Sequence, residues 1–247
     1  MITFVVIATK RYTRYAHNLI RSLEASMQEA SEVILLTDDI AMFLKLERSL
    51  KTITLRSVAI ESLGWPRATL LRYELISKHL EPSNGDVVCY LDADTLMVRS
   101  TSSNDFKKHL SVESPIALVQ HPGYFRRNAV HRTLTKSTLG PWETRSFSSA
   151  YVPFSMRSSY VCGGVIFGQK SAFIDMCHQL KSAIDRDAIK GIVAKHNDES
   201  YLNRWAMKRS VVRLSPEWAF SEGYRNLRGI IPRIQVIHKP STWVREG

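Results

Sequence analysis

Two aspartates that follow an apolar run have the types and spacing that most clearly indicate chemistry. Asp92 and Asp94 lie in V-V-C-Y-L-D-A-D-T-L-M-V, residues 87–98. Carboxylates at positions i and i+2 of a strand end point the same way across the pleat, so they can share one hard divalent cation such as Mn²⁺ or Mg²⁺. A cation held there can neutralise a departing diphosphate as its charge develops. The alternative is a plain acidic turn after an edge strand.

A second acidic pair, Asp198 and Glu199, lies in the run H-N-D-E-S. A carboxylate held beneath an anomeric carbon can shield or attack a developing oxocarbenium ion. The other interpretation is that both residues belong to the acidic first turn of a helix, where the helix dipole favours negative charge. The residue types alone leave both interpretations open.

The C-terminal tail is basic and contains His238, Lys239 and Arg245. Such a tail can close over a diphosphate and exclude water from it, or it can simply be solvated. Gly163 and Gly164 lie inside a predicted strand, which glycine weakens unless something such as a sugar ring approaches the backbone closely.

Strands that alternate with helices must position these residues. Short β-branched runs predict strands at residues 2–8, 33–37, 52–58 and 86–91. Apolar side chains at helical spacing predict helices between them, the last beginning at Pro66. This alternation indicates a mostly parallel sheet, which binds ligands at the carboxyl ends of its strands.

The second half of the chain has a different pattern. Strands are predicted at 116–120, 161–168, 211–214 and 234–237, and helices at 171–190 and 198–208. Between the first two strands lies a polar, turn-rich stretch, residues 121–159. Because this stretch is too long for a simple connection, we expect it to carry function.

Composition limits the class of protein and its partners. The 247 residues contain 44% hydrophobic residues and no repeat or linker, which predicts one soluble domain. The net charge of +11 indicates an anionic partner, which can be nucleic acid, an anionic membrane surface or a phosphorylated small molecule. The charges are scattered and form no recognised nucleic-acid module, so no nucleic-acid partner is expected.

Three cysteines, Cys89, Cys162 and Cys177, lie in apolar surroundings without paired spacing. They predict reduced, packed thiols. No apolar stretch approaches the roughly 20 residues that a membrane span requires. We therefore expect a cytoplasmic protein, and contact with the inner face of an anionic membrane stays open.

The sequence also resembles a known family. The run H-N-D-E-S-Y-L-N-R-W, followed by V-V-R-L-S-P-E-W, is similar to the catalytic helix and next strand of glycosyltransferase family 6, the family of the ABO blood-group transferases and the α-1,3-galactosyltransferase. The blocks L-D-A-D, A-L-V-Q-H-P-G-Y and W-E-T-R-S-F-S-S-A-Y-V-P, and the Gly-Gly strand, occur in family order. The chain resembles the short bacterial or phage members without an anchor and stem.

This resemblance implies a fold and an activity. The expected fold is a single GT-A domain over residues 1–247, Rossmann-like, with a mixed, mostly parallel sheet flanked by helices. Residues 1–100 would form the nucleotide-binding half, and 101–247 the acceptor and catalytic half with a closing C-terminal tail. The implied activity is metal-dependent, retaining transfer of Gal or GalNAc from a UDP-sugar to an oligosaccharide or glycolipid in α-1,3 linkage. The oligomeric state stays open.

The resemblance also implies roles for individual residues. The donor-binding positions are Ile7, Ala8, Thr9, Tyr12, Arg72, Asp92, Asp94, Cys162, Gly163, Gly164, Asp198, Lys239 and Arg245. Asp92 and Asp94 also match the metal ligands, Mn²⁺ or Mg²⁺ being the expected ion. The acceptor-binding positions are His121, Trp142, His196 and Glu199, with Glu143 beside Trp142. Glu199 matches the candidate nucleophile. His196 and Asn197 differ from the animal enzymes, so acceptor specificity does not carry over.

Three alternatives remain at this point. A related retaining GT-A transferase can use another nucleotide sugar, and a non-catalytic carbohydrate-binding relative can keep the pocket alone. The intact Asp92, Asp94 and Glu199 argue against the non-catalytic relative. A nucleic-acid-binding protein is the third. Within the leading interpretation, Gly164 and the small Cys162 favour UDP-GalNAc over UDP-Gal, because they leave room for an acetamido group.

Overall fold

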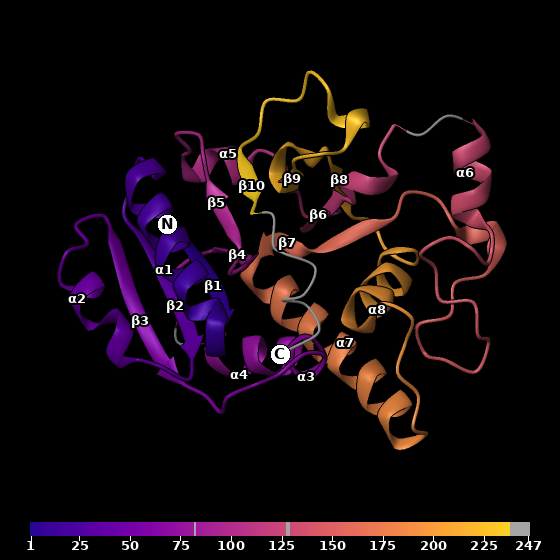
Figure 1. Cartoon of the computed structure of the whole chain (residues 1–247), viewed down its shortest axis with the longest axis horizontal. Helices are drawn as coiled ribbons and strands as arrows, with labels where there is room; N and C mark the ends of the chain where they lie inside the picture. Colours follow the sequence, from indigo (N-terminus) through magenta and orange to yellow (C-terminus); the bar gives the residue numbers. More distant parts are fainter. Residues whose placement is uncertain (82, 127–128, 238–247) are drawn as a thin grey trace.

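The structure is a computed structural model that describes residues 1–81, 83–126 and 129–237 (Figure 1). Within these residues, seven strands form the main sheet in the order β3-β2-β1-β4-β7-β6-β8. Its strands are β1 (Ile2–Ala8), β2 (Ser31–Thr37), β3 (Ile53–Ala59), β4 (Val87–Asp92), β6 (Ile116–Gln120), β7 (Val161–Gln169) and β8 (Val212–Leu214). The predicted α/β class with a mostly parallel sheet is therefore confirmed.

The direction of β7 decides what lies beside the end of β4. Strands β1, β2, β3 and β4 run parallel to one another. Strand β7 runs antiparallel to β4, with Leu91 opposite Val165. The beginning of β7 therefore lies next to the carboxyl end of β4. This pairing brings Gly163 and Gly164 close to Asp92, although they are about 70 residues apart in sequence.

A second, small sheet returns the end of the described chain to this region. It consists of β5 (Thr95–Met97), β10 (Ile234–Val236) and β9 (Phe220–Ser221). Strand β10 lies beside β5 in Figure 1, and Ile237 donates its N–H to the carbonyl of Asp94 at 2.7 Å. The chain thus reaches the acidic pair again just before the tail that contains Lys239 and Arg245, which lie outside the described residues.

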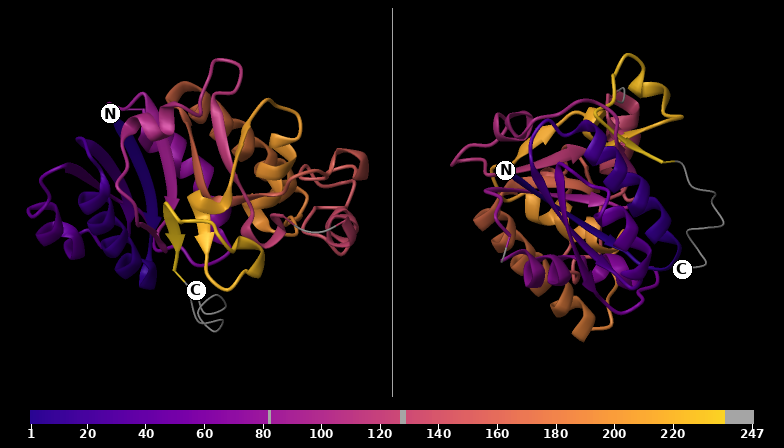
Figure 2. Two further views of the ribbon diagram at one scale, coloured as in Figure 1. Left: turned by 90° about the horizontal axis from the view of Figure 1, so that it is seen from above. Right: turned by 90° about the vertical axis from the view of Figure 1, so that its left-hand side faces the viewer.

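Helices cover both faces of the main sheet. Their bounds are α1 (Thr13–Ser26), α2 (Leu44–Glu47), α3 (Arg67–Leu70), α4 (Arg72–Leu80), α5 (Ser103–Lys107), α6 (Ala129–Lys136), α7 (Lys170–Ile189) and α8 (Asn197–Ala206). Successive strand residues point to opposite faces, so Phe4 packs in the core with α1 and α5. Val5 packs in the other core, with α4, α7 and α8. The two views of Figure 2 show these layers from above and from the side.

Most predicted strands and helices occur within a few residues of their expected bounds. The prediction was wrong in three places. The helix from Pro66 is interrupted at Leu71, so that α3 and α4 are separate. The stretch 121–159 contains α6, and the short β5, α5 and β9 were not predicted because they hold too few apolar residues for a periodic signal. The three cysteines are free and buried, as expected.

Candidate active site

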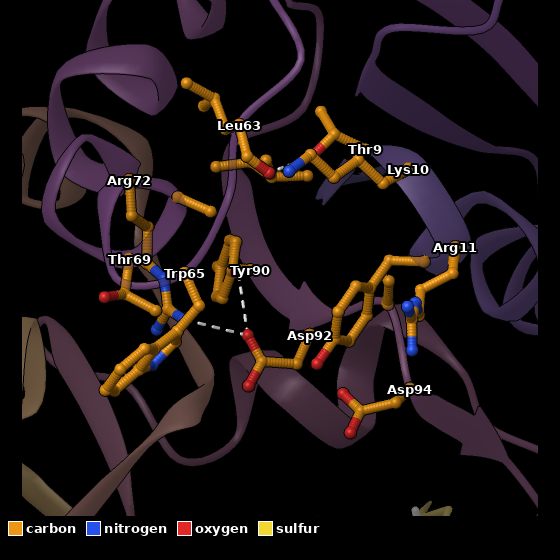
Figure 3. A pocket seen from close by; sticks show the side chains of 14 residues that line it. Thr9, Lys10, Arg11, Leu63, Trp65, Thr69, Arg72, Tyr90, Asp92 and Asp94 are labelled. Atoms are coloured by element: carbon orange, nitrogen blue, oxygen red, sulfur yellow. Dashed lines mark hydrogen bonds and ion pairs between the residues drawn. The ribbon is translucent and has the colours of Figure 1, made fainter. Parts of the chain in front are cut away.

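A cavity of about 250 Å³ lies where β1 and β4 end, at the point where the strand order reverses (Figure 3). Crevices at such a point are where open α/β sheets bind ligands. Its lining residues are Ile7, Thr9, Lys10, Arg11, Tyr12, Leu63, Trp65, Ala68, Thr69, Arg72, Tyr90, Asp92, Ala93 and Asp94. The first-strand segment and the acidic pair therefore meet in one cavity, as the sequence predicted.

Asp92 and Asp94 reach the cavity in a different way from the one expected. Strand β4 ends at Asp92, and Asp94 lies in the following turn, so pleat alternation does not align the two side chains. The turn is held by Thr95, whose hydroxyl donates to the Asp92 carbonyl at 2.8 Å. Figure 3 shows both carboxylates on the same side of the cavity.

One carboxylate oxygen of Asp92 is engaged by neighbouring side chains, and the other is left uncovered. Its Oδ1 accepts hydrogen bonds from the Tyr90 hydroxyl at 2.8 Å and from Arg72 at 3.0 Å. A side chain at position 164 would place a Cβ only 2.8 Å from Oδ2, so Gly164 keeps that oxygen uncovered. The described residues contain no cluster of three or more His, Cys, Asp or Glu side chains suited to a metal. A cation held by Asp92 and Asp94 would therefore need further oxygen ligands from water or a bound diphosphate.

Arg72 connects Asp92 of the first acidic pair to Asp198 of the second. It is 6% exposed, and its Nη2 lies 3.0 Å from Asp92 Oδ1 while its Nη1 lies 3.0 Å from Asp198 Oδ2. Nη1 also donates to the Gly163 carbonyl at 2.7 Å. Its guanidinium stacks 4.6 Å from the ring centre of Tyr90. Burial disfavours the charge of Arg72, but Asp198, Tyr90 and Asp92 outweigh this effect and raise its pKa.

Asp198 and Glu199 lie in the first turn of α8, so the structural interpretation of this pair is correct and the functional one remains compatible with it. The Gly163 N–H donates to Glu199 Oε2 at 2.9 Å. Burial raises the pKa of Glu199 to about 7, although this hydrogen bond favours the charged form. Burial also raises the pKa of Asp198 to about 6, against the effect of Arg72. Burial therefore raises the pKa of both carboxyl groups above its ordinary value.

Rings from three segments gather beside Glu199. Tyr160 lies 5.6 Å from Tyr124, 6.0 Å from His121 and 6.4 Å from His196, measured between ring centres. The Nδ1 atom of His121 accepts from the Gly123 N–H at 3.1 Å. Burial, together with the nearby His196, lowers the pKa of His121 to about 4, so this imidazole is neutral at physiological pH. Tyr160 itself is buried, whereas His121 and Tyr124 are half-buried and His196 is exposed, so these three rings are the ones that can contact a ligand.

Trp142, a predicted acceptor-binding residue, and its neighbour Glu143 have structural roles. Trp142 is 1% exposed and packs edge-to-face against Tyr160, with ring centres 5.1 Å apart, so it holds Tyr160 in place. Glu143 is also buried, and it accepts hydrogen bonds from Arg145 and from the Lys195 N–H. Burial opposes ionisation of Glu143, but these hydrogen bonds prevail and lower its pKa to about 2.

Some predicted donor-site residues lie away from the cavity surface. Ala8 is buried in the core and is absent from the described lining. Cys162 is also buried, and burial raises the pKa of its thiol, so it is a packed residue. Lys239 and Arg245 lie outside the described residues. Thr9 lines the cavity, and its hydroxyl donates to the Leu63 carbonyl at 2.8 Å.

Sequence reasoning missed two prominent residues of the cavity. Tyr90 lies two positions before Asp92, so strand alternation could have placed both on one face. Trp65, which is 55% exposed, offers a large aromatic surface at the cavity edge, and its position next to Pro66 gave no signal of this.

The chain is similar in sequence to known proteins. The profile of glycosyltransferase family 6 matches residues 1–246. The O-antigen biosynthesis glycosyltransferase WbnI of Escherichia coli is 26% identical over 178 residues, 70% of this chain and 69% of the relative. Histo-blood group ABO system transferase 2 of Rattus norvegicus is 26% identical over 251 residues, 97% and 69% of the two chains. Globoside alpha-1,3-N-acetylgalactosaminyltransferase 1 of Mus musculus is 32% identical over 192 residues, 73% and 49% of the two chains.

The fold is thus an α/β fold of the GT-A type, with its cavity at the strand ends. Because the family profile matches almost the whole chain, the protein belongs to glycosyltransferase family 6, which confirms the resemblance. Membership implies a nucleotide-sugar donor and a glycan acceptor. None of the helices in the described part of the chain has the length and apolar character needed to cross a membrane. The expected single domain and its division near residue 100 stay predictions.

Proposed function

We propose that this protein is a metal-dependent, retaining transferase that moves GalNAc or Gal from a UDP-sugar to a glycan in α-1,3 linkage. The relatives support the choice of sugar, since the mouse protein is named as an α-1,3-N-acetylgalactosaminyltransferase. A bound Mn²⁺ or Mg²⁺ would neutralise the diphosphate of the leaving UDP, and Asp92 and Asp94 are the residues that would hold it.

The chain's own residues would divide the remaining tasks. The end of β1, with Thr9 and Tyr12, would hold the nucleoside in the cavity. Asp198 would accept hydrogen bonds from the hydroxyls of the donor sugar. Glu199 would face the anomeric carbon from the side opposite the leaving group, either as a nucleophile or as a charge that stabilises an ion-pair-like state. The neighbouring aromatic rings would bind the acceptor.

One observation carries this proposal, namely that Gly163 and Arg72 join Asp92 of the first pair to Asp198 and Glu199. The Gly163 carbonyl accepts from Arg72, which contacts Asp92 and Asp198, and its N–H donates to Glu199. A Cβ at this position would lie 3.0 Å from Arg72 Nη1, so a larger residue would require that group to shift by a few tenths of an ångström. The diphosphate end and the sugar end of a donor would therefore lie within one rigid group of side chains.

The test is turnover of a panel of nucleotide sugars, with free-sugar release and transfer to a panel of glycans as separate readouts. We expect turnover of UDP-GalNAc or UDP-Gal that needs added Mn²⁺ and stops in excess EDTA. Asp92→Asn should remove most of it, whereas Asp86→Asn, an exposed aspartate elsewhere, should not. Turnover of a different nucleotide sugar only would favour the related-transferase alternative, and donor binding without any turnover would favour a non-catalytic relative.

Within this proposal, UDP-GalNAc remains the preferred donor because Gly164 has no side chain, whereas Cys162 is packed in the core and adds no room. In the structure, Asp92 Oδ2 lies 2.8 Å from the place that a Cβ of residue 164 would take. The Asp92 carboxylate therefore occupies some of the space that Gly164 leaves. Competition between UDP-GalNAc and UDP-Gal at equal concentration measures the preference directly. A higher kcat/KM for UDP-Gal would reverse it.

A further inference from the structure

Tyr90 is a buried residue of β4 whose side chain contacts both members of an ion pair in the cavity wall. It is 2% exposed, and its backbone is held between β1, opposite Val5, and β7, opposite Ile166. Its hydroxyl donates to Asp92 Oδ1 at 2.8 Å, and the Arg72 guanidinium lies 4.6 Å from its ring centre. Because Arg72 Nη2 is itself 3.0 Å from Asp92 Oδ1, the three side chains form a closed set in which each contacts the other two (Figure 3).

These contacts leave the two oxygens of the Asp92 carboxylate in different situations. Oδ1 accepts from Tyr90 and from Arg72, whereas Oδ2 has no hydrogen-bond or ion-pair partner among the residues that the structure describes. The last torsion of an aspartate side chain is broad, so a carboxylate without fixed partners turns readily and exchanges its two oxygens. Two donors on one oxygen oppose that rotation. Oδ2 is therefore the oxygen that remains available to a ligand in the cavity.

The ring and the hydroxyl of Tyr90 have separable roles. The ring packs in the core on the α4, α7 and α8 side of the sheet, where a phenylalanine would fill the same space. The hydroxyl needs a hydrogen-bond partner because it is buried, and that partner is Asp92. Phenylalanine at this position would keep the packing and remove one donor from the carboxylate. The contribution of the hydroxyl can therefore be measured apart from that of the ring.

We propose that Tyr90 is a positioning residue of the donor site, whose hydroxyl holds the Asp92 carboxylate with Oδ2 free for the divalent cation and whose ring keeps Arg72 against Oδ1. This role presupposes the metal-dependent reaction proposed above. Tyr90 would act through Asp92 and touch no reacting atom. Hydrogen-bond partners of metal-ligating side chains orient those ligands, and their removal typically weakens metal binding or activity by about 10- to 100-fold.

The test is the affinity of the full chain for Mn²⁺ in the presence of UDP, measured by electron paramagnetic resonance, which requires no turnover. Tyr90→Phe removes the hydroxyl and keeps the ring. We expect this variant to bind Mn²⁺ more weakly than the wild type by about tenfold or more. Excess Mn²⁺ should then restore most of the wild-type turnover, because the hydroxyl orients a ligand and takes no part in the reaction.

Tyr201→Phe is a matched control for the loss of a buried hydroxyl. Tyr201 is also 2% exposed, and its hydroxyl donates to a buried carboxylate, Asp187 Oδ2, at 3.0 Å. Neither of these residues is among those that line the cavity. The control variant loses the same kind of hydrogen bond, and it should change Mn²⁺ affinity by about twofold at most. Thermal unfolding without metal shows that both variants fold.

Tyr90→Leu tests the ring, since it removes the stacking partner of Arg72 together with the hydroxyl. It should weaken Mn²⁺ binding at least as much as Tyr90→Phe does, and it should also raise the donor KM at saturating Mn²⁺. A donor KM equal to that of Tyr90→Phe would exclude the role of the ring.

Three outcomes would overturn the role of the hydroxyl and leave the proposed function standing. They are a Tyr90→Phe variant with the Mn²⁺ affinity of the wild type, equal weakening by Tyr201→Phe, and turnover of Tyr90→Phe that stays low at saturating Mn²⁺, which would place the hydroxyl on the donor itself. A wild type that binds no Mn²⁺ in the presence of UDP would instead refute the metal-dependent reaction, and the positioning role with it. The wild-type measurement therefore separates the two failures.

Discussion

Replacing Glu199 with glutamine tests both the proposed nucleophile and its surroundings. Burial raises the pKa of this carboxyl group from its ordinary 4.5 to about 7, against the favourable hydrogen bond from the Gly163 N–H. A group whose pKa rises on folding binds its proton more tightly in the folded chain. Its contribution to stability is therefore complete below about pH 4.5 and is lost as the pH rises through about 7.

The size of this effect follows from the same values. A pKa of about 7 instead of 4.5 corresponds to about 3 kcal/mol at a pH above both, since a tenfold change in proton affinity is about 1.4 kcal/mol. Glu199 keeps partial solvent exposure, and screening by solvent reduces the effect, so we expect about 1 to 2 kcal/mol. Glutamine does not ionise. The Glu199→Gln variant should therefore be more stable than the wild type at about pH 8.5, with a smaller difference at about pH 5.

The Glu199→Gln variant should be less active than the wild type, although it is more stable at high pH. Loss of a transition-state interaction should lower kcat by about 100-fold with little change in donor KM. The wild-type kcat should rise with pH up to about 7, because the charged carboxylate is the active form. The assays are denaturant unfolding in EDTA at both pH values and steady-state kinetics, with exposed Glu47→Gln as the control. A variant with near-normal kcat, or with the same stability difference at both pH values, would refute this reasoning.

Three further predictions concern the donor side. Asp92→Asn and Asp94→Asn should each abolish the response of turnover to Mn²⁺; retained activation by Mn²⁺ in either variant would contradict the assigned ligands. Asp198→Asn removes the carboxylate that lies 3.0 Å from Arg72, so it should raise donor KM, in contrast to Glu199→Gln, whose donor KM should change little. Deleting residues 238–247 should weaken UDP binding in calorimetry by about tenfold and reduce turnover, and unchanged binding would exclude a role for the tail.

The main strands and the position of the acidic pair could be predicted because each is indicated by a short local sequence pattern. The β-branched runs of β1 and β4 and the acidic pair after β4 are each contained in a few adjacent residues, and the structure places them at one cavity. The short α6 was missed because it lies in a polar stretch, where an amphipathic pattern only eight residues long is hard to distinguish from turns. The role of Asp94 was predicted through the wrong geometry, since a turn and not the pleat brings it to the cavity.

What local patterns could not supply is the reversed direction of β7. Strand β7 runs antiparallel to β4, and this direction depends on contacts between residues that are far apart in the sequence. No local sequence pattern indicates it. Yet this direction brings Gly163 to Arg72 and so joins Asp92 to Asp198 and Glu199. Gly163 and Gly164 weaken an interior strand of the sheet, and glycine is needed there because Arg72 and Asp92 come within 3.0 Å and 2.8 Å of the places that a Cβ would take. The two positions that weaken β7 are therefore the positions on which the proposed chemistry depends.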